Sequence, residues 1–312
     1  MKANIVITDW GFPSLEPEQS VFSSHDIELT AYQCRTEDEV ARVAVDADIV
    51  ITQWAPVKRK AIEGMRRCKG IVRYGIGLDN IDLEAARAKG IPVRNVPDYC
   101  LNEVADHTMA FILALQRQVC RVFHLVQEGI WHITPPLELP PLRKSTLGLI
   151  GFGRIAQLVA QRAQPFGLEV IASDPYAGED LFLSTGTKRT SVDELFATAD
   201  IISLHCPLTE ETRHIVNAST LGRMKKNSML VNTSRGGLVD IEALEVALRE
   251  GRIAGAALDV LEQEPIAPDH PILTLPNIIV TSHIAWYSSE SVHELQQRAA
   301  LTAVELLNAH NQ

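Results

Sequence analysis

The sequence predicts an α/β fold with two domains, each built on a parallel sheet that helices cover on both faces. Short apolar segments rich in Val and Ile alternate with segments of helical periodicity along the whole chain. Strands that are buried on both faces have this nearly continuous apolar character. A chain of 312 residues is long enough for two hydrophobic cores. Two strand candidates, 47–53 and 199–205, begin with the same three residues, as expected of two domains with the same βα organisation.

The first series of elements occupies residues 1 to about 99. Strands are expected at residues 4–9, 47–53, 70–75 and 91–96. Helical spacing is present at 36–47 and 80–90, and Gly90 ends the second of these helices as a C-terminal cap.

The second series begins near residue 146, after a long helical pattern at 100–129 and a Trp- and Pro-rich arm at 130–142. We expect the arm to be structured, because the whole connecting segment is strongly apolar. A last amphipathic helix is expected at 290–310, and its apolar face must dock on another element. Strands are expected at residues 146–151, 168–174, 199–205, 228–234, 254–260 and 277–283.

The composition is that of an ordinary globular protein, with 46% hydrophobic and 22% charged residues. A net charge of −10 argues against nucleic acid or an anionic membrane as the main partner. The longest apolar run, 109–115, is much shorter than a membrane span, and the apolar run at the N-terminus is too short for a signal peptide. We therefore expect a cytoplasmic protein.

The cysteines predict neither a disulfide framework nor a metal site. There are five, an odd number, and they show no CxxC or Cys/His ligand spacing. We expect reduced thiols, as is usual in the cytosol. They stand at positions 34, 68, 100, 120 and 206.

A glycine-rich loop predicts a dinucleotide site. The strand 146–151 runs into GFGRIA, residues 151–156, which matches the pattern G-x-G-x-x-G/A with Ala156 in the third position. Gly151 permits the tight turn, and Gly153 lets the backbone approach a pyrophosphate. Arg154 and Ile155 open a helix whose N–H groups face that anion.

The residue that ends the next strand favours NAD over NADP. Asp174 lies 23 residues after Gly151, close to where an acidic residue meets the adenosine ribose 2′-hydroxyl. A carboxylate there repels the 2′-phosphate of NADP. An Asp that merely caps the loop before Pro175 is the alternative.

Three charged residues follow the nucleotide loop in order. Arg235 and His283 come at the ends of expected strands, and Glu264 stands in the loop after the strand 254–260. Ligands bind at the carboxyl ends of strands in such sheets. A guanidinium binds a carboxylate bidentately, and an imidazole next to a carboxylate becomes a stronger base. Together they suit hydride exchange at a carbon beside a carboxylate, although each alone could be a structural residue.

At this point the sequence resembles the D-isomer-specific 2-hydroxyacid dehydrogenase family over nearly the whole chain. Six motifs occur in the family's order: VRYGIGLDNIDLEAARAKGIPV, LGLIGFGRIAQLVAQRAQPFGLEVIASDPY, HCPLTEETRHIVN, MKKNSMLVNTSRGGLVD, GAALDVLEQEP and SHIAWYS. The resemblance implies two Rossmann-like domains. A flavodoxin-like substrate domain comprises residues 1–99 and 285–312, and a doubly wound NAD-binding domain comprises 100–284.

The resemblance implies the chemistry of the three charged residues. His283 protonates the carbonyl oxygen when NADH reduces a 2-oxo acid, and it takes the hydroxyl proton in the reverse direction. Glu264 hydrogen-bonds His283 and keeps it protonated, and Arg235 binds the substrate carboxylate and carbonyl oxygen. Formate dehydrogenases are less similar, because they carry glutamine where Glu264 stands.

The resemblance also implies the binding residues. Arg73 and the backbone N–H groups of its turn receive the substrate carboxylate, and Asp259 holds the carboxamide of NAD. The substrate set is Arg73, Tyr74, Gly75, Ile76, Gly77, Arg235, His283 and Trp286. The NAD set is Gly151, Phe152, Gly153, Arg154, Ile155, Asp174, Cys206, Pro207, Thr212, Thr233, Ser234, Arg235, Asp259 and His283.

Two motifs, HIAWYS and VRYGIG, look most like the branch that contains the carboxy-terminal-binding proteins and their bacterial relatives. In that branch Trp286 lies over the substrate side chain, which favours a flat or apolar group. Trp54 and Tyr74 either line the same pocket or pack in the core. Residues 100–142 match the region through which the family dimerises, so a homodimer is expected.

Two other interpretations stay open. A short-form D-3-phosphoglycerate dehydrogenase needs a cationic site for the distal phosphate, with Arg73 and the KRK run at 58–60 as candidates. A non-catalytic NAD(H)-sensing binding protein, similar to the corepressors of that branch, does not need the set of Arg235, Glu264 and His283.

Overall fold

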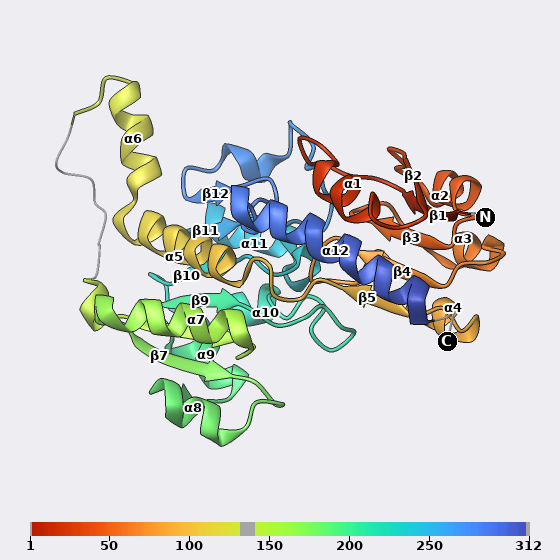
Figure 1. The fold of residues 1–312 in the computed structure, drawn as a ribbon. Helices are drawn as coiled ribbons and strands as arrows, with labels where there is room; N and C mark the ends of the chain where they lie inside the picture. Colours follow the sequence, from red (N-terminus) through yellow and green to blue (C-terminus); the bar gives the residue numbers. More distant parts are fainter. Residues whose placement is uncertain (1, 132–140, 310–312) are drawn as a thin grey trace. The chain divides into compact units, whose positions relative to one another are not determined.

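The computed structural model describes residues 2–131 and 141–309. The chain divides into two compact units, Met1–Cys100 with Tyr287–Gln312, and Leu101–Trp286 (Figure 1). These boundaries lie one to two residues from the expected ones. Each unit contains one parallel sheet, which confirms the predicted α/β fold.

The first unit has five parallel strands in the order β2-β1-β3-β4-β5. The sheet pairs β1 with both β2 and β3, so the chain order reverses at β1. The edge strand β2 was not predicted, because none of its side chains is fully buried and its apolar signal is weak. The strands are β1 Ala3–Ile7, β2 Ile27–Ala31, β3 Ile49–Thr52, β4 Gly70–Arg73 and β5 Val93–Asn95.

Short capped helices connect these strands, and the C-terminal helix completes the unit. Thr36 and Glu39 form a capping box at the start of α2, and Gly90 follows α4 in the left-handed conformation, with φ +70°. The helix α12 packs against α1, β3 and β4, which gives its apolar face the docking place it needs. The helices are α1 Glu16–Phe22, α2 Glu37–Val43, α3 Arg59–Gly64, α4 Leu83–Ala88 and α12 Ser289–Ala309.

The second unit has seven parallel strands in the order β12-β11-β10-β9-β6-β7-β8. Two hydrophobic clusters lie in this unit, one built around Phe196 and Leu230 and the other around Phe152 and Val231. The edge strand β8 has two exposed residues and was not predicted. The strands are β6 Thr146–Ile150, β7 Glu169–Ser173, β8 Lys188–Arg189, β9 Ile201–Leu204, β10 Met229–Asn232, β11 Gly255–Leu258 and β12 Ile278–Val280.

The helices of this unit cover both faces of the sheet, and α5 packs against α7, β10 and β11. Side chains of Ser191, Asn217 and Asp240 accept hydrogen bonds from the first turns of α9, α10 and α11. The helices are α5 Leu101–Arg117, α6 Val119–Gln127, α7 Arg154–Ala163, α8 Glu179–Thr185, α9 Val192–Thr198, α10 Ala218–Leu221 and α11 Ile241–Arg249, with 3₁₀ turns η1 Leu142–Lys144, η2 Gln164–Phe166, η3 Gly236–Leu238 and η4 Pro271–Thr274.

The single helix predicted over 100–129 was wrong. The chain breaks at Gln118, which adopts the left-handed conformation with φ 49°, and α5 and α6 meet at a bend of 59°. Of the expected arm at 130–142, residues 132–140 lie outside the described part of the chain. Within the described residues no single helix is long and apolar enough to cross a membrane, although α5 and α6 together pass that test.

Candidate active site

The glycine loop joins β6 to α7. Gly151 has φ +87°, and a Cβ there would lie 2.6 Å from the amide nitrogen of Cys206, so no larger residue fits. Gly153 precedes α7 with ordinary backbone angles, has no side-chain cap, and has open space where a Cβ would stand. The ten-residue helix thus begins at an uncapped end with open space beside it, which is the arrangement that binds phosphate.

Asp174 closes the neighbouring strand β7 and is tied to this loop. Its Oδ2 accepts the N–H of Phe152 at 2.8 Å, and its Oδ1 accepts the N–H groups of Tyr176 and Ala177 at 2.7 and 3.1 Å. The carboxylate is therefore held still beside the glycine turn. This agrees with both interpretations of Asp174, as a loop cap and as the acceptor for a ribose hydroxyl.

The next loop along the sheet follows β9 and lies against the glycine turn. Burial lowers the pKa of His205 to about 4, so its ring is neutral at pH 7 and hydrogen-bonds Ser203. Burial likewise raises the pKa of the Cys206 thiol to about 11, which makes it unreactive. The backbone of this loop is fixed by Thr212, whose hydroxyl donates to the carbonyl of Pro207 at 2.7 Å.

Arg235 follows β10 in a loop with fixed geometry. The Ser234 hydroxyl donates to the carbonyl of Cys206 at 2.8 Å, and the Asn232 amide donates to the carbonyl of Arg235 at 2.8 Å. A Cβ on Gly236 would lie 1.9 Å from the carbonyl carbon of Leu261. Glycine at 236 thus lets the loop that carries Arg235 lie directly against the loop that carries Glu264.

His283 and Glu264 form a hydrogen-bonded pair. The Nδ1 atom of His283 lies 2.7 Å from Oε2 of Glu264, and Oε1 accepts the N–H of Leu261 at 2.8 Å. Burial raises the pKa of Glu264, but the hydrogen bond and charge of His283, the Leu261 N–H and the charge of Arg235 together bring it below its usual value. Glu264 is therefore a carboxylate at neutral pH, and it orients the imidazole so that Nε2 is left for proton transfer.

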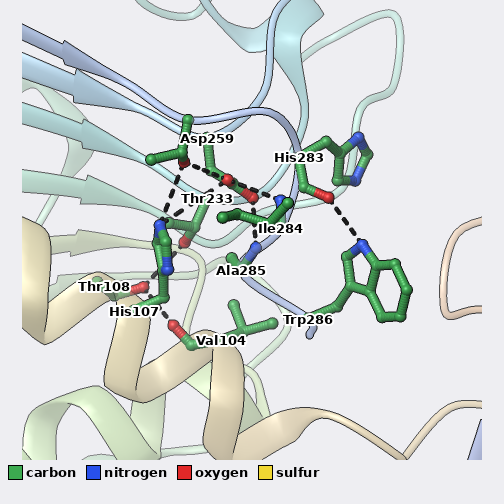
Figure 2. Close-up of polar contacts among 10 residues, drawn as sticks. Val104, His107, Thr108, Thr233, Asp259, His283, Ile284, Ala285 and Trp286 are labelled. Atoms are coloured by element: carbon green, nitrogen blue, oxygen red, sulfur yellow. Dashed lines mark hydrogen bonds and ion pairs between the residues drawn. The ribbon is translucent and has the colours of Figure 1, made fainter. Parts of the chain in front are cut away.

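The loop that carries His283 is held by Asp259, as Figure 2 shows. The Asp259 side chain is buried, and its oxygens accept the N–H groups of Ile284 and Ala285, each at 2.9 Å. The Thr281 hydroxyl donates to Oδ1, and the N–H of His283 donates to the carbonyl of Asp259 at 2.8 Å. Asp259 thus binds its own chain on both sides of His283. Its expected contact with the NAD carboxamide has to use the remaining acceptor capacity of Oδ2.

Trp286 is fixed by the same loop. Its Nε1 donates to the carbonyl of His283 at 2.7 Å, so the indole is bound to the backbone of the residue that carries the imidazole (Figure 2). Any movement of the indole is therefore expected to disturb His283.

In the first unit, Arg73 is the last residue of β4, directly before the turn that contains Gly75. Gly75 has φ +137°, and a Cβ there would lie 1.4 Å from Nη1 of Arg73, so the guanidinium lies across this glycine. The Asn95 amide donates to the carbonyl of Ile76 at 2.6 Å and helps to fix the turn before Gly77.

The expected substrate contact of the Tyr74 side chain is corrected by the structure. Tyr74 is 1% exposed, packs edge-on against Phe12 and donates its hydroxyl to Glu18 at 2.7 Å. Gln296 of α12 also donates to Glu18, so Tyr74 belongs to a buried network inside its own unit. Trp54, the other aromatic in question, is about half exposed.

Sequence reasoning brought Arg235, Glu264 and His283 together and missed their supports. Arg235, Glu264 and His283 follow β10, β11 and β12, which are adjacent in the sheet. The supports that it missed are His107 and Thr108 in α5 and Thr281. Only Thr281, two residues before His283, had a local signal. Among the described residues, no group of three or more His, Cys, Asp or Glu side chains could hold a metal ion.

Comparison with known proteins agrees with this geometry. Residues 109–285 match the family model described as D-isomer specific 2-hydroxyacid dehydrogenase, NAD binding domain. A D-3-phosphoglycerate dehydrogenase of Methanocaldococcus jannaschii is 42% identical over 272 residues, which are 86% of this chain and 51% of the relative. The chain thus spans about half the length of that relative.

Two further proteins match over most of their length. A glyoxylate reductase of Korarchaeum cryptofilum is 40% identical over 268 residues, covering 85% of this chain and 80% of the relative. The crystal structure of a D-lactate dehydrogenase from Aquifex aeolicus, complexed with NAD and lactic acid, has a TM-score of 0.90 and 30% identity and covers 98% of this chain and 96% of its own.

Proposed function

This chain belongs to the D-isomer specific 2-hydroxyacid dehydrogenase family, and we propose that it interconverts a 2-oxo acid and a D-2-hydroxy acid with NAD. The observation that carries the proposal is the pair of His283 and Glu264, which lies next to the Arg235 loop at the carboxyl ends of three adjacent strands. A protein that only binds NAD does not need this set.

The glycine loop fits a dinucleotide. Gly151 and Gly153 and the uncapped start of α7 leave room for a pyrophosphate, and Asp174 stands beside them to accept a ribose hydroxyl. When bound, NAD accepts the hydride from the 2-hydroxy acid, and NADH supplies it to the 2-oxo acid. The acidic Asp174 supports NAD rather than NADP.

The residues of this chain handle the proton and the substrate charge. During reduction, His283 gives the proton on Nε2 to the substrate carbonyl oxygen, while Glu264 on Nδ1 stabilises the charged imidazolium that precedes this step. During oxidation, the neutral ring takes the hydroxyl proton. Arg235 binds the substrate carboxylate and carbonyl oxygen, and Arg73 binds the carboxylate with the N–H groups of its turn.

A D-3-phosphoglycerate dehydrogenase activity is the second candidate, favoured by the 42% identity to such an enzyme. The basic run at 58–60 gives it little support. Lys60 pairs with Asp38 at 2.8 Å, Arg59 lies 3.7 Å from both Glu63 and Asp82, and Lys58 donates to the carbonyl of Asp79 at 2.7 Å. A phosphate would have to compete with these partners, so a small 2-oxo acid is the better candidate.

We further propose a cytoplasmic homodimer that associates through α6. This helix buries none of its residues, and one of its faces is an exposed apolar stripe made by Val119, Val122, Phe123 and Val126. Exposed apolar stripes of this kind mark protein interfaces, and the family resemblance supports a second copy as the occupant. The five cysteines are free thiols, as expected in the cytosol.

The deciding experiment is steady-state turnover with a panel of 2-oxo acids: glyoxylate, pyruvate, hydroxypyruvate, 3-phosphohydroxypyruvate and branched-chain 2-oxo acids. Each is assayed with NADH and NADPH, and the same panel is run on His283→Ala. We expect oxidation of NADH with at least one unphosphorylated acid, abolished in the variant. NADH binding without turnover of any acid contradicts an enzymatic function and favours a sensor. Turnover of the phosphorylated acid alone favours the second candidate.

A further inference from the structure

One chain of hydrogen bonds leads from α5 to the loop that carries His283. The Nε2 atom of His107 lies 3.2 Å from the Thr281 hydroxyl and 3.8 Å from Oδ1 of Asp259. The Thr281 hydroxyl in turn donates to Oδ1 of Asp259. His107 and Thr281 are 174 residues apart in the sequence, so only the fold brings them together.

Proton counting fixes the direction of this chain. The Thr281 hydroxyl has one hydrogen, and Asp259 as a carboxylate can only accept. That hydrogen therefore points to Asp259, and Thr281 accepts from His107. The Nε2 atom of His107 must carry a proton, so His107 is the donor at the head of a chain that ends on the Asp259 carboxylate.

The carboxylate at the end of the chain controls the conformation of His283. His283 has φ 57°, in the left-handed region, which is strained for a residue with a side chain. Such a residue keeps this conformation only where its surroundings over-determine it. Here the N–H groups of Ile284 and Ala285 bind the Asp259 carboxylate, and the N–H of His283 binds the Asp259 carbonyl.

The helix makes a second link from the adjacent residue. The hydroxyl of Thr108 lies 2.9 Å from the hydroxyl of Thr233, two residues before Arg235, and also donates to the carbonyl of Val104 at 2.8 Å. Two consecutive residues of α5 therefore hold the loops that carry Arg235 and His283. The same helix therefore holds Arg235 and His283 in position relative to each other.

We propose that His107 is a positioning residue for the acid–base group His283. It orients the Thr281 hydroxyl, Thr281 and Asp259 lock the turn 283–285, and the turn keeps the imidazole aligned with Glu264 and the substrate oxygen. The kinetic part of this inference rests on the proposed function. The structural part, a coupling between His107 and His283, does not.

The kinetic test compares two replacements in the full chain. His107→Phe keeps the ring that packs edge-on against Phe111 at 4.5 Å but removes the donor, and His107→Gln restores an N–H near the position of Nε2. With glyoxylate and NADH, or the best acid of the panel, we expect His107→Phe to lower kcat about tenfold with little change in the KM for NADH. His107→Gln should keep most of the activity. Equal losses in both variants overturn the proposal.

Thr281→Val tests the link without touching the helix. It should lower kcat about as far as His107→Phe does. The kcat of the double variant should be no lower than that of Thr281→Val alone, because both changes interrupt the same series of hydrogen bonds. Losses that multiply in the double variant contradict the proposal. If His107→Phe does not fold, Thr281→Val still decides the question, since wild-type kcat in that variant contradicts the link.

The coupling itself is measured without turnover. In full-length protein labelled with ¹³Cε1-histidine, the His283 signal is assigned by its loss in His283→Ala and followed through a pH titration. We expect His107→Phe and Thr281→Val to change its titration midpoint and line width, and His107→Gln to leave them close to wild type. An unchanged His283 titration in both disruptive variants overturns the proposal. If the wild type reduces none of the acids, the proposed function fails, while this titration still tests the coupling.

Discussion

Nδ1 of His283 is held 2.7 Å from Oε2 of Glu264, and the carbonyl of the same histidine accepts the indole N–H of Trp286. The imidazole is thus fixed through its side chain and through its backbone. Its remaining nitrogen, Nε2, is the only atom of the ring left for proton exchange with a substrate.

Glu264→Gln keeps the size of the side chain and one hydrogen-bonding oxygen but removes the charge that stabilises the imidazolium. Reduction requires the protonated ring, so we expect kcat/KM for reduction to fall about 100-fold at neutral pH. The basic limb of its pH profile should move to lower pH. Profiles measured for both directions between about pH 5 and pH 9 check this. A profile with its limbs unmoved contradicts the role of Glu264.

The same variant has a pH-dependent effect on stability, and its sign follows from the pKa of Glu264. This pKa is lowered from its usual 4.5 in the folded protein. The ionised carboxylate therefore stabilises the fold above pH 4.5, and this contribution is lost as the pH falls through the lower, folded value. The difference in Tm between wild type and Glu264→Gln should be present at pH 7 and should shrink as the pH falls below 4.5.

Substitutions of the two glycines in the nucleotide loop test protein stability and NADH binding separately. Gly151→Ala places a Cβ 2.6 Å from the Cys206 nitrogen at φ +87°, so we expect a loss of about 2 kcal/mol in the free energy of unfolding. Gly153→Ala meets no protein atom within 4 Å, so its stability should match wild type. Its methyl group occupies the space proposed for the pyrophosphate, and we expect NADH to bind about tenfold more weakly by calorimetry. Undiminished NADH binding by Gly153→Ala places the dinucleotide elsewhere.

The features that could be predicted from the sequence are those that leave a pattern within a short segment of the chain. The alternation of buried strands with helices is a property of each short segment, and so is the spacing of Gly151, Gly153 and Asp174. Edge strands β2 and β8 have no buried side chains, so their apolar signal is weak or absent. The break at Gln118 has no Gly or Pro to signal it. The contact of His107 with Thr281 spans 174 residues and exists only once the sheet and α5 have packed together.

The preference for NADH over NADPH should depend on the charge of Asp174. Asp174→Asn is isosteric and removes the charge that repels a 2′-phosphate, and Arg189 donates to the carbonyl of residue 174 at 3.4 Å, so a cation is at hand. We expect the ratio of kcat/KM for NADH over NADPH to fall at least about tenfold. Asp180→Asn, which removes an exposed acid in α8, is the matched control and should leave the ratio unchanged. An unaltered ratio in Asp174→Asn means that Asp174 only caps its loop.

The apolar stripe on α6 predicts how the chain associates. Phe123 is 57% exposed, and Phe123→Asp places a charge at the centre of the stripe, so we expect the proposed dimer to dissociate to a monomer. Leu183→Asp changes a more exposed leucine, 72% accessible on α8, and should leave the dimer intact. Analytical ultracentrifugation of both variants distinguishes them. Dimers that survive Phe123→Asp have their interface on another surface.

The anchored indole of Trp286 predicts a specific split in substrate kinetics. Trp286→Phe keeps an aromatic wall but loses the hydrogen bond to the His283 carbonyl, so it should lower kcat for all acids by a similar factor, because the turn that holds His283 loosens. Trp286→Ala removes the wall as well, so it should raise the ratio of kcat/KM for branched-chain 2-oxo acids over that for glyoxylate by about tenfold. Both variants are measured on the same panel as wild type. If Trp286→Ala and Trp286→Phe share one selectivity profile, the indole anchors the catalytic turn and does not form the wall of the substrate pocket.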